Sequence, residues 1–318
     1  MIVCCGEALV DMVPDGERPD AFLAKPGGCP YNTAIAAGRL GTKVSFLGRI
    51  GTDFLGTRLY DHLISNGVDV SIVARRDQAA TLAFVSRDAQ GNARYAFYSE
   101  GAADRSFATE DLPPKLPPET RFLMIGSISM VEEPIATTVE ALAGREWRNL
   151  MVSLDPNIRP GFIRDRAAYI ERLERWTALS SIVKTSSDDL EWLYPGLPPE
   201  ACLDRILARG PVLAIATLGA DGVMAKTSAA DVFLPSFKVE VADTIGAGDT
   251  FHAALLARLD AEGYTNRDAL TRLDASGLER MLRFPNAAAA VNCTRTGAEP
   301  PTEPETRAFL AARGFPDA

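Results

Sequence analysis

The stretch Asp243-Thr-Ile-Gly-Ala-Gly-Asp-Thr-Phe-His252 decides how this chain is interpreted. Gly246 and Gly248 stand one residue apart and are followed at once by Asp249 and a strongly helical run over 253–259. Glycines at a helix start let the backbone approach a ligand closely, and the exposed N–H groups and the helix dipole attract anions. The segment therefore predicts an anion site at the start of a helix.

Asp249 is out of place at an anion site unless it has a chemical task. A carboxylate there repels phosphate, but it is useful if it accepts a proton from a hydroxyl that attacks phosphorus. The alternative is that Asp249 only caps the helix, which aspartate does readily. This segment alone leaves both interpretations open.

The composition is that of an ordinary globular enzyme. The chain has 318 residues, of which 47% are hydrophobic and 24% charged, as in typical globular domains. No apolar run approaches the roughly 20 residues that span a bilayer. The N-terminus lacks a basic segment, so we expect no signal peptide and a cytoplasmic location. The net charge of −9 argues against nucleic-acid or membrane partners.

Cysteine and histidine usage narrows the chemistry. The five cysteines are scattered without a C-x-x-C motif, so neither a zinc site nor a disulfide framework is expected. Cys4 and Cys5 should point to opposite faces of a strand. The chain has only two histidines, so acid–base chemistry is expected to rest on carboxylates.

Strand and helix patterns alternate along the chain. This alternation predicts a mainly parallel sheet with helices on both faces, a three-layer αβα sandwich built as a single domain over 1–318. The expected strands are 2–5, 44–50, 122–126, 151–155, 181–184 and 212–217, with a late antiparallel pair at 223–226 and 231–234. The expected helices are 31–40, 54–65, 166–178, 199–209, 250–260 and 277–292. Thr302 and Glu305 form a capping box for a last helix.

A β lid is expected outside the main sheet, from about residues 12–26 and 79–104. Residues 81–86 and 93–98 flank a run of turn residues and predict a hairpin. Tyr95, Phe97 and Phe84 alternate on its strands, and could pack over a ligand or across a dimer. We expect one face of the hairpin to form a two-fold homodimer interface, since a lone two-stranded ribbon is marginal in water.

Polar and glycine motifs follow several strands, where open α/β sheets gather ligands. Asp11 could accept hydroxyl hydrogen bonds from a polyol, or it is simply solvated. Gly27 and Gly28 admit a ligand close to the backbone, and Asn32 supplies a donor and an acceptor; a plain glycine loop is equally compatible. Arg159, after the strand ending at Asp155, could neutralise phosphate charge.

Later loops suggest a nucleotide side. Lys184-Thr-Ser-Ser-Asp-Asp189 could hold hydrated Mg²⁺ through Asp189, with Ser186 nearby, or it is an N-capped acidic helix start. Thr217-Leu-Gly-Ala-Asp-Gly222 is a tight strand-to-strand turn or a phosphate loop. No Gly-x-x-x-x-Gly-Lys-Ser/Thr motif is present, so this is not a P-loop nucleoside triphosphatase.

Together these motifs resemble the ribokinase-like sugar kinases, the phosphofructokinase-B family, and locally its bacterial fructokinases. The match covers nearly the whole chain in order. The motifs that carry it are Gly27-Gly28 with Asn32, Leu40-Gly41, Gly48-x-x-Gly51-x-Asp53-x-x-Gly56, Asp155-x-Asn157-x-Arg159, Thr217-Leu-Gly219-x-Asp221-Gly222, Asp243-Thr-x-Gly246-Ala247-Gly248-Asp249-Thr-Phe251, residues 93–98 and residues 286–298.

The resemblance implies an ATP-dependent sugar kinase with Asp249 as the base. The amides of Gly246, Ala247 and Gly248 would form the anion hole, with Arg159 stabilising charge. The implied sugar-binding residues are Asp11, Gly27, Gly28, Asn32, Phe97, Arg159 and Asp249. The implied ATP-binding residues are Lys184, Ser186, Thr217, Gly219, Gly222, Gly246, Gly248 and Asn286. Mg²⁺ would be held through water by Asp189, and K⁺ by Asp243, Asn292, Arg295 and Gly297.

The chain departs from the family pattern at two metal motifs. The Asn-x-x-Glu motif for magnesium appears as Ser186-Ser-Asp-Asp189, which leaves the metal geometry open. A small hydroxylated residue expected after the C-terminal Gly-Ala pair is replaced by Pro301, with Thr302 adjacent, which puts K⁺ dependence in doubt.

Fructose is the expected acceptor, phosphorylated to fructose 6-phosphate. A sugar acid brings a carboxylate whose burial requires a dedicated cation, and Arg159 is already needed for phosphate. The hairpin offers Arg87 and Arg94, and the loop from Asp11 to Asn32 offers Arg18 and Lys25. A loop arginine such as Arg105 could also reach in. The alternatives are a 2-keto-3-deoxygluconate kinase or another sugar kinase on the same framework, and, more remotely, a non-catalytic sugar or nucleotide sensor. A nicotinamide dehydrogenase is disfavoured, because Gly6 after the first strand is not followed by the G-x-G-x-x-G pattern.

Overall fold

The computed structural model describes residues 1–316 except 17, 19 and 88–92, and describes residues 86, 87 and 93–95 by backbone alone. Its centre is an eight-stranded sheet in the order β14-β13-β12-β11-β10-β9-β1-β4. The strands from β12 to β4 are parallel, and β13 and β14 join as an antiparallel pair, as the sequence predicts. Their bounds are β1 (Ile2–Cys5), β4 (Val44–Leu47), β9 (Phe122–Gly126), β10 (Met151–Asp155), β11 (Ile182–Ser186), β12 (Leu213–Thr217), β13 (Gly222–Lys226) and β14 (Asp231–Pro235).

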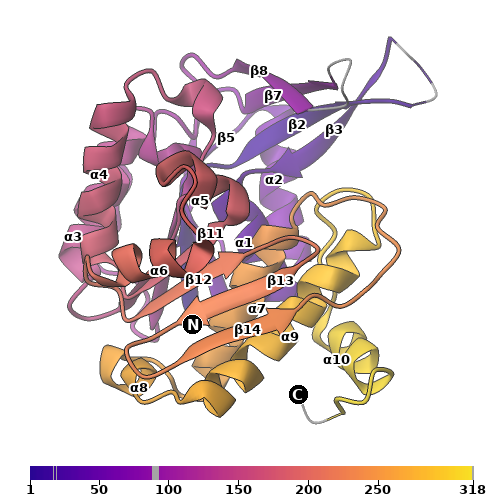
Figure 1. The fold of residues 1–318 in the computed structure, drawn as a ribbon. Coiled ribbons are helices and arrows are strands. Elements are labelled where there is room, and N and C mark those ends of the chain that lie inside the picture. The colour runs from indigo at the N-terminus through magenta and orange to yellow at the C-terminus, as the bar shows by residue number, and fades with distance from the viewer. Residues whose placement is uncertain (17, 19, 88–92, 317–318) are drawn as a thin grey trace.

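Helices cover both faces of this sheet, so the predicted three-layer α/β architecture is confirmed (Figure 1). One layer contains α1 (Cys29–Arg39), α2 (Phe54–Ser65), α7 (Ala247–Ala261), α8 (Arg267–Thr271), α9 (Ala275–Cys293) and α10 (Glu303–Ala311). The other contains α3 (Ile135–Glu146), α4 (Arg166–Leu179), α5 (Ser187–Leu193) and α6 (Pro199–Leu207). In the described part of the chain, no helix is long and apolar enough to cross a membrane.

Alternation along the strands gives each face its own core. Cys4 packs in the core beneath α1 and α7, whereas Cys5 packs in the core beneath α3 and α4. The prediction that these cysteines face opposite ways is therefore confirmed. Burial raises the pKa of both thiols well above the ordinary value, so they remain protonated packing groups.

A second sheet of four strands projects from the main body, at the top of Figure 1. Its order is β3-β2-β7-β8, with bounds β2 (Leu9–Pro14), β3 (Phe22–Gly27), β7 (Thr81–Arg87) and β8 (Ala93–Tyr98). The hairpin β7–β8 is therefore not a lone ribbon as the sequence analysis assumed, because β7 pairs with β2 in parallel. Asp11 correspondingly lies on a strand of this sheet and not in a loop.

Other boundaries differ from the predictions for local reasons. The strand expected over 44–50 divides at Gly48, where a Cβ would lie 2.5 Å from the carbonyl oxygen of Gly6. The segment after it, β5 (Arg49–Gly51), pairs instead with β6 (Ala74–Arg76). The capping box at Thr302 and Glu305 is confirmed at the start of α10. The short helical turns η1 (Thr109–Asp111), η2 (Ser127–Met130) and η3 (Pro160–Phe162) complete the elements.

Candidate active site

The helix α7 begins inside the glycine motif, three residues earlier than the sequence pattern predicts. Gly246 is its N-cap residue, in the left-handed conformation with φ 75°, which favours glycine. A Cβ on Gly246 would also lie 2.6 Å from the Cβ of Ala298. The turn into the helix therefore requires glycine for both its backbone conformation and its packing against the 292–298 loop.

Backbone amides at the start of α7 are available to an anion. The N–H of Ala247 donates to the carbonyl oxygen of Thr244 at 3.2 Å, so this member of the predicted anion hole has an internal partner. Among the described residues, the amides of Gly246, Gly248 and Asp249 meet no protein acceptor. Free N–H groups at the positive end of a helix attract negatively charged groups.

Asp249 is buried at the third position of α7, with 7% of its surface exposed. The side-chain amide of Asn32 donates to its Oδ2 at 2.9 Å, which brings α1 and α7 together at the site. Burial raises the pKa of Asp249 to about 6, and the nearby Asp155 adds to the rise, while Asn32, Cys29 and Lys184 oppose it. A carboxylate with a pKa near neutrality is well suited to accept a proton.

A buried polar network lies behind Asp249. The ammonium of Lys184 donates to Asp155 Oδ2 at 2.9 Å, and both side chains are fully buried. His252 Nε2 lies 2.6 Å from Ser153 Oγ, and burial lowers the pKa of His252 to about 3, so this histidine is neutral. A Cβ on Gly248 would lie 2.9 Å from Lys184 Nζ. The network therefore places a fixed positive charge beside the anion site.

The predicted sugar-binding residues gather opposite Asp249. A Cβ on Gly27 would lie 2.2 Å from Asp11 Oδ2, and one on Gly28, whose φ is 109°, would lie 2.8 Å from the carbonyl oxygen of Glu7. Burial raises the pKa of Asp11 to about 6, Arg159 lowers it and Asp249 raises it. Asp11 therefore lies within electrostatic range of both Arg159 and Asp249, and the space beside these side chains is the candidate sugar site.

Strand register decides which lid aromatics face this space. Asp11 pairs with Ala83, and Ala83 pairs with Phe97, so all three lie on the same face of the lid. The ring of Phe97 packs on Phe162 with centroids 4.1 Å apart. Phe84 lies one position along β7 and therefore faces the other way, which corrects its grouping with Phe97. The side chain of Tyr95 lies outside the described residues.

Sequence reasoning missed several groups that support the site. Glu7 Oε1 accepts from the N–H of Cys29 at 3.1 Å, and the hydroxyl of Ser129 contacts the same carboxylate. The Cys29 thiol lies within 3.9 Å of Asp155 Oδ2 and also bonds Asp249. Glu7 lies just after the first strand, with only Gly6 between them, and this position was the signal available in the sequence. Phe162 had none, because nothing in the local pattern marks it as a packing partner of the lid.

The glycines in the turn after β12 are explained by the backbone conformation and packing of the turn itself. Gly219 has φ 58° and Gly222 has φ 138°, and a Cβ on Gly222 would lie 2.0 Å from the carbonyl oxygen of Leu234. The side-chain amide of Asn286 donates to the carbonyl oxygen of Pro235 at 2.9 Å. The turn thus joins β12 to β13 with β14 alongside, and its contact with a nucleotide stays a prediction.

The carboxylate of Asp189 is fully engaged within the protein. Oδ1 accepts from the N–H of Ile158 at 2.7 Å, and Oδ2 accepts from the N–H and hydroxyl of Ser186 at 2.8 and 2.7 Å. Asp189 thereby ties the loop after β10 to the capping box of α5. This geometry matches the helix-start interpretation, while water-mediated binding of Mg²⁺ stays a prediction. Thr217, which was also predicted to bind ATP, has a partner within the protein as well. Its hydroxyl donates to the carbonyl oxygen of Thr185 at 3.2 Å.

The residues expected to hold K⁺ meet beside the start of α7. Asp243 Oδ2 accepts from the N–H of Gly297 at 2.9 Å, and Asn292 donates to the carbonyl oxygen of Ile245 at 2.8 Å. The Arg295 side chain turns away, to Glu305 at 2.6 Å. These contacts join the loops around the expected K⁺ position, but the Asp243 carboxylate is occupied by backbone N–H groups. The donor set therefore does not by itself indicate a cation, and K⁺ binding stays a prediction.

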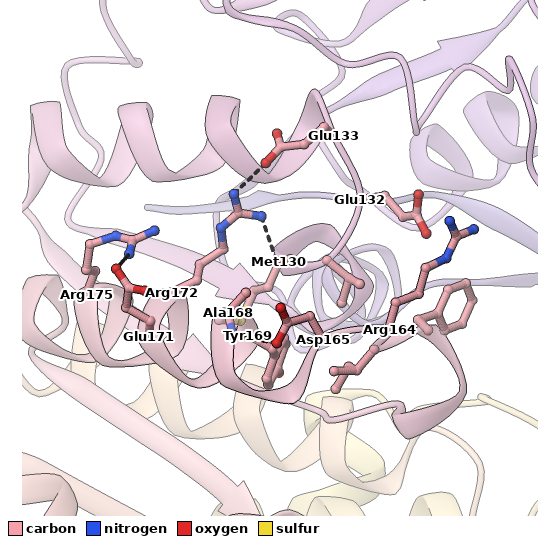
Figure 2. A pocket seen from close by; sticks show the side chains of 13 residues that line it. Met130, Glu132, Glu133, Arg164, Asp165, Ala168, Tyr169, Glu171, Arg172 and Arg175 are labelled. Carbon is pink, nitrogen blue, oxygen red and sulfur yellow. Dashed lines mark hydrogen bonds and ion pairs between the residues drawn. The ribbon is translucent and has the colours of Figure 1, made fainter.

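A cavity of about 480 Å³ lies away from Asp249, between η2, η3 and α4 (Figure 2). Its charged groups are largely matched: Arg172 bonds Glu133 and the carbonyl oxygen of Met130, and Arg175 pairs with Glu171. It contains none of the predicted sugar, nucleotide or metal residues. The chemistry therefore stays predicted at the start of α7 and not at this cavity.

Comparisons with known proteins find similar sequences and similar structures. The model of the "pfkB family carbohydrate kinase" matches residues 1–305. A fructokinase of Rhizobium leguminosarum bv. trifolii is 42% identical over 282 residues, which cover 87% of this chain and 85% of that protein. The structure of a Xylella fastidiosa fructokinase with bound ATP has a TM-score of 0.90 at 31% identity, covering 98% of each chain. A Vibrio cholerae O395 fructokinase bound to fructose, ADP and calcium has a TM-score of 0.84 at 26% identity, covering 97% of this chain and 98% of that one.

Proposed function

The chain belongs to the pfkB family of carbohydrate kinases, and we propose that it transfers the γ-phosphoryl group of ATP to the primary 6-hydroxyl of fructose. The observation that carries this proposal is the buried carboxylate of Asp249, which has a pKa of about 6 and lies beside free amides at the start of α7. Relatives of this chain are fructokinases, one with ATP bound and one with fructose and ADP.

The proposed step is an in-line displacement at the γ-phosphorus of MgATP. The sugar hydroxyl oxygen forms the new P–O bond while its proton passes to Asp249. The bond between the γ-phosphorus and its bridging oxygen breaks, and ADP leaves with that electron pair. The amides of Gly246 and Gly248 and the ammonium of Lys184 face the charge that develops on phosphorus. Such preorganised donors and charges stabilise the transition state without reorganising.

Substrate binding orients the acceptor. Asn32 holds Asp249 through a hydrogen bond of 2.9 Å and retains an amide oxygen for a sugar hydroxyl. Asp11 can accept hydroxyl hydrogen bonds, and the absence of a side chain at Gly27 and Gly28 lets the Asp11 carboxylate and the Glu7 backbone pack closely against this loop. Arg159 donates to backbone carbonyls of its own loop and is exposed, so it is free to turn toward a phosphate.

The charge of the site favours a neutral sugar. On the segment between Asp11 and Asn32, Arg18 is paired with Asp15 at 2.7 Å, and Lys25 is exposed. The side chains of Arg87 and Arg94, considered for a sugar acid, lie outside the described residues. A buried carboxylate on the substrate would require a dedicated cation. This supports fructose over 2-keto-3-deoxygluconate, which remains the second candidate.

An ADP-release assay with a panel of acceptors tests the proposal. The panel contains fructose, ribose, 2-keto-3-deoxygluconate, glucose and adenosine, each at several concentrations with MgATP. We expect fructose to have the highest kcat/KM. A higher kcat/KM for 2-keto-3-deoxygluconate would replace fructose by the second candidate. No acceptor-dependent release from any member would favour the sensor interpretation.

Activity should depend on pH through the base. The deprotonated form of Asp249 is the one that accepts a proton, and its pKa is raised to about 6. The value of kcat/KM should therefore be constant well above pH 6 and fall about tenfold per pH unit well below it. A pH profile of kcat/KM with fructose, with ADP coupling enzymes in excess at each pH, measures this. A profile that stays flat from pH 8 down to pH 5 would contradict the assignment.

The outer face of the lid supports a homodimer. Phe84 contacts Phe22 and Tyr98 edge to face, at centroid distances of 5.0 and 5.5 Å, and Phe22 and Tyr98 are 43% and 67% exposed. Large exposed aromatics gathered on one sheet face commonly mark an interface. We propose a two-fold dimer through this face.

Substitution of Tyr98 by glutamate should weaken this dimer, because a charge would be buried between the subunits. Light scattering at micromolar concentration should give a dimer for the wild type and a lower mass for the Tyr98→Glu variant. Asp188→Asn, an exposed change in the first turn of α5 and not on a lid strand, serves as the control. A fully active wild-type monomer at that concentration would refute the dimer.

The remaining cofactor and location proposals rest on the family and the sequence. We propose that Mg²⁺ enters with ATP, since this ion prefers phosphate oxygens and water with few protein carboxylates. K⁺ would lie near Asp243 and Asn292 if it binds. The proposed location is the cytoplasm, where ATP and free sugars are available.

A further inference from the structure

Arg105 is a buried cation without a hydrogen-bond partner. Only 6% of the residue is exposed. Among the described residues, Arg105 is the arginine whose Nε and both terminal nitrogens are all buried and unpartnered. Buried polar groups are hydrogen-bonded in almost all proteins, and an unpaired buried cation is costly. Such a group is expected where a ligand completes its hydrogen bonds.

Its surroundings connect Arg105 to the sugar side of the active site. The guanidinium lies over the ring of Phe162, 5.0 Å from its centroid. Phe162 packs on Phe97 at 4.1 Å, and Phe97 shares a lid face with Asp11 through the register of β2, β7 and β8. Phe162 also lies three residues after Arg159. Arg105 therefore contacts the aromatic pair Phe162 and Phe97, which lies beside the substrate-facing side of the lid.

The neighbouring Asp104 is a second incomplete group. Its Oδ1 accepts from the Thr81 hydroxyl at 2.5 Å, while its Oδ2 is buried and unpartnered and lies 4.0 Å from Arg105 Nε. Thr81 pairs with Leu9 in the lid sheet, and Leu9 pairs with Gly27. The acceptor Asp104 and the donor Arg105 thus lie side by side. Asp104 is held by its hydrogen bond from Thr81, whose strand pairs with the strand that carries Asp11.

We propose that Arg105 and Asp104 are specificity-determining residues that bind the sugar hydroxyls remote from the phosphorylated one. This inference rests on the proposed function. With Asp249 and Asn32 at one end of the sugar, the pair completes the other end, and Phe97 and Phe162 form an apolar wall alongside the sugar. Hydroxyl groups both donate and accept, so a vicinal diol satisfies the free nitrogens of Arg105 and the free oxygen of Asp104 together.

The pair also explains how a site with a buried arginine can prefer a neutral substrate. Asp104 offsets the charge of Arg105 at 4.0 Å, so the ion pair carries no net charge. A substrate carboxylate would approach Arg105 beside this aspartate and meet repulsion as well as attraction. The same arginine without Asp104 would select a sugar acid. The geometry therefore assigns Arg105 to hydroxyl recognition.

The test compares Arg105→Met with Arg164→Met. Arg164 is exposed and lies near Phe162 in sequence, so its replacement is the matched control. Hydrogen bonds to a charged group contribute about 1.5–3 kcal/mol, which corresponds to a rise of about 10- to 100-fold in KM for fructose. The KM for ATP should change less than about twofold in both variants, and Arg164→Met should leave the KM for fructose unchanged. Protection of the folded protein by fructose alone, measured as a shift in Tm, should be lost only in Arg105→Met.

A second variant tests whether any effect of Arg105→Met comes from misfolding. Arg105→Met leaves Asp104 buried without its partner, so the double variant Asp104→Asn with Arg105→Met removes both charges, and it should show the same rise in KM. A folded variant with unchanged KM for fructose and unchanged Tm protection would overturn the inference. So would a variant that loses only sugar-acid turnover, because Arg105 would then bind a carboxylate. A wild type inactive with fructose instead refutes the proposed function, and the comparison then uses the preferred acceptor of the panel.

Discussion

Replacing Asp249 by asparagine should lower kcat with fructose by at least ~10²-fold, the usual scale for loss of a general base. Asparagine keeps the size of the side chain and can still accept the hydrogen bond from Asn32, but it cannot take the proton of the attacking hydroxyl. The amides of Gly246 and Gly248 are unchanged, so affinity for ATP should be retained. Steady-state kinetics with fructose and calorimetric titration with ATP measure the two quantities.

The control for Asp249→Asn is Asp188→Asn. Asp188 is exposed in the first turn of α5, so the same chemical change there should leave kcat unchanged. The free energy of unfolding should not fall in Asp249→Asn, because the change removes a buried charge. Near-wild-type turnover in this variant would exclude Asp249 as the base and return it to the role of a helix-capping residue.

Replacing Lys184 by methionine should cost about 3–5 kcal/mol of folding free energy, the usual result of breaking a buried ion pair. The change leaves Asp155 charged and fully buried, with its Oδ1 already unpartnered. It also removes the positive charge beside Gly248, so turnover of the folded fraction should fall. Denaturant unfolding, followed by fluorescence, measures the loss of stability.

Two further variants isolate the cause of the effect. Lys226 forms partly exposed ion pairs with Asp204 and Asp231, so Lys226→Met should cost no more than about 1 kcal/mol. Adding Asp155→Asn to Lys184→Met removes the stranded charge and should recover part of the stability. A cost below 1 kcal/mol for Lys184→Met would mean that the buried pair contributes little.

The main sheet and the position of Asp249 at a helix start could be predicted from the sequence because their signals are local. Buried parallel strands appear as short apolar runs, and β9 and β10 have the predicted bounds. The glycines around Asp249 identify a helix start by themselves. The exact start was misplaced, since Gly246 and Gly248 argue against helix by propensity, whereas the left-handed N-cap at Gly246 allows α7 to begin at Ala247.

The lid and the far end of the site could not be predicted as well, because they depend on pairings between distant segments. The strands β2 and β3 contain Asp11, Pro14, Lys25 and Pro26, which hide the alternation that marks a strand. Their pairing with β7 exists only in the folded protein. The sequence marks Arg105 only as a loop arginine that could reach the sugar, and nothing around it indicates that its side chain is buried.

The central claim, that this chain phosphorylates fructose at its 6-hydroxyl, is tested most directly by identifying the product. The protein is incubated with MgATP and fructose, and the products are followed by phosphorus NMR. The account predicts a single new phosphomonoester, fructose 6-phosphate, formed in equal amount to ADP and absent with Asp249→Asn. ADP without a sugar phosphate, or a phosphate on another hydroxyl, would contradict it.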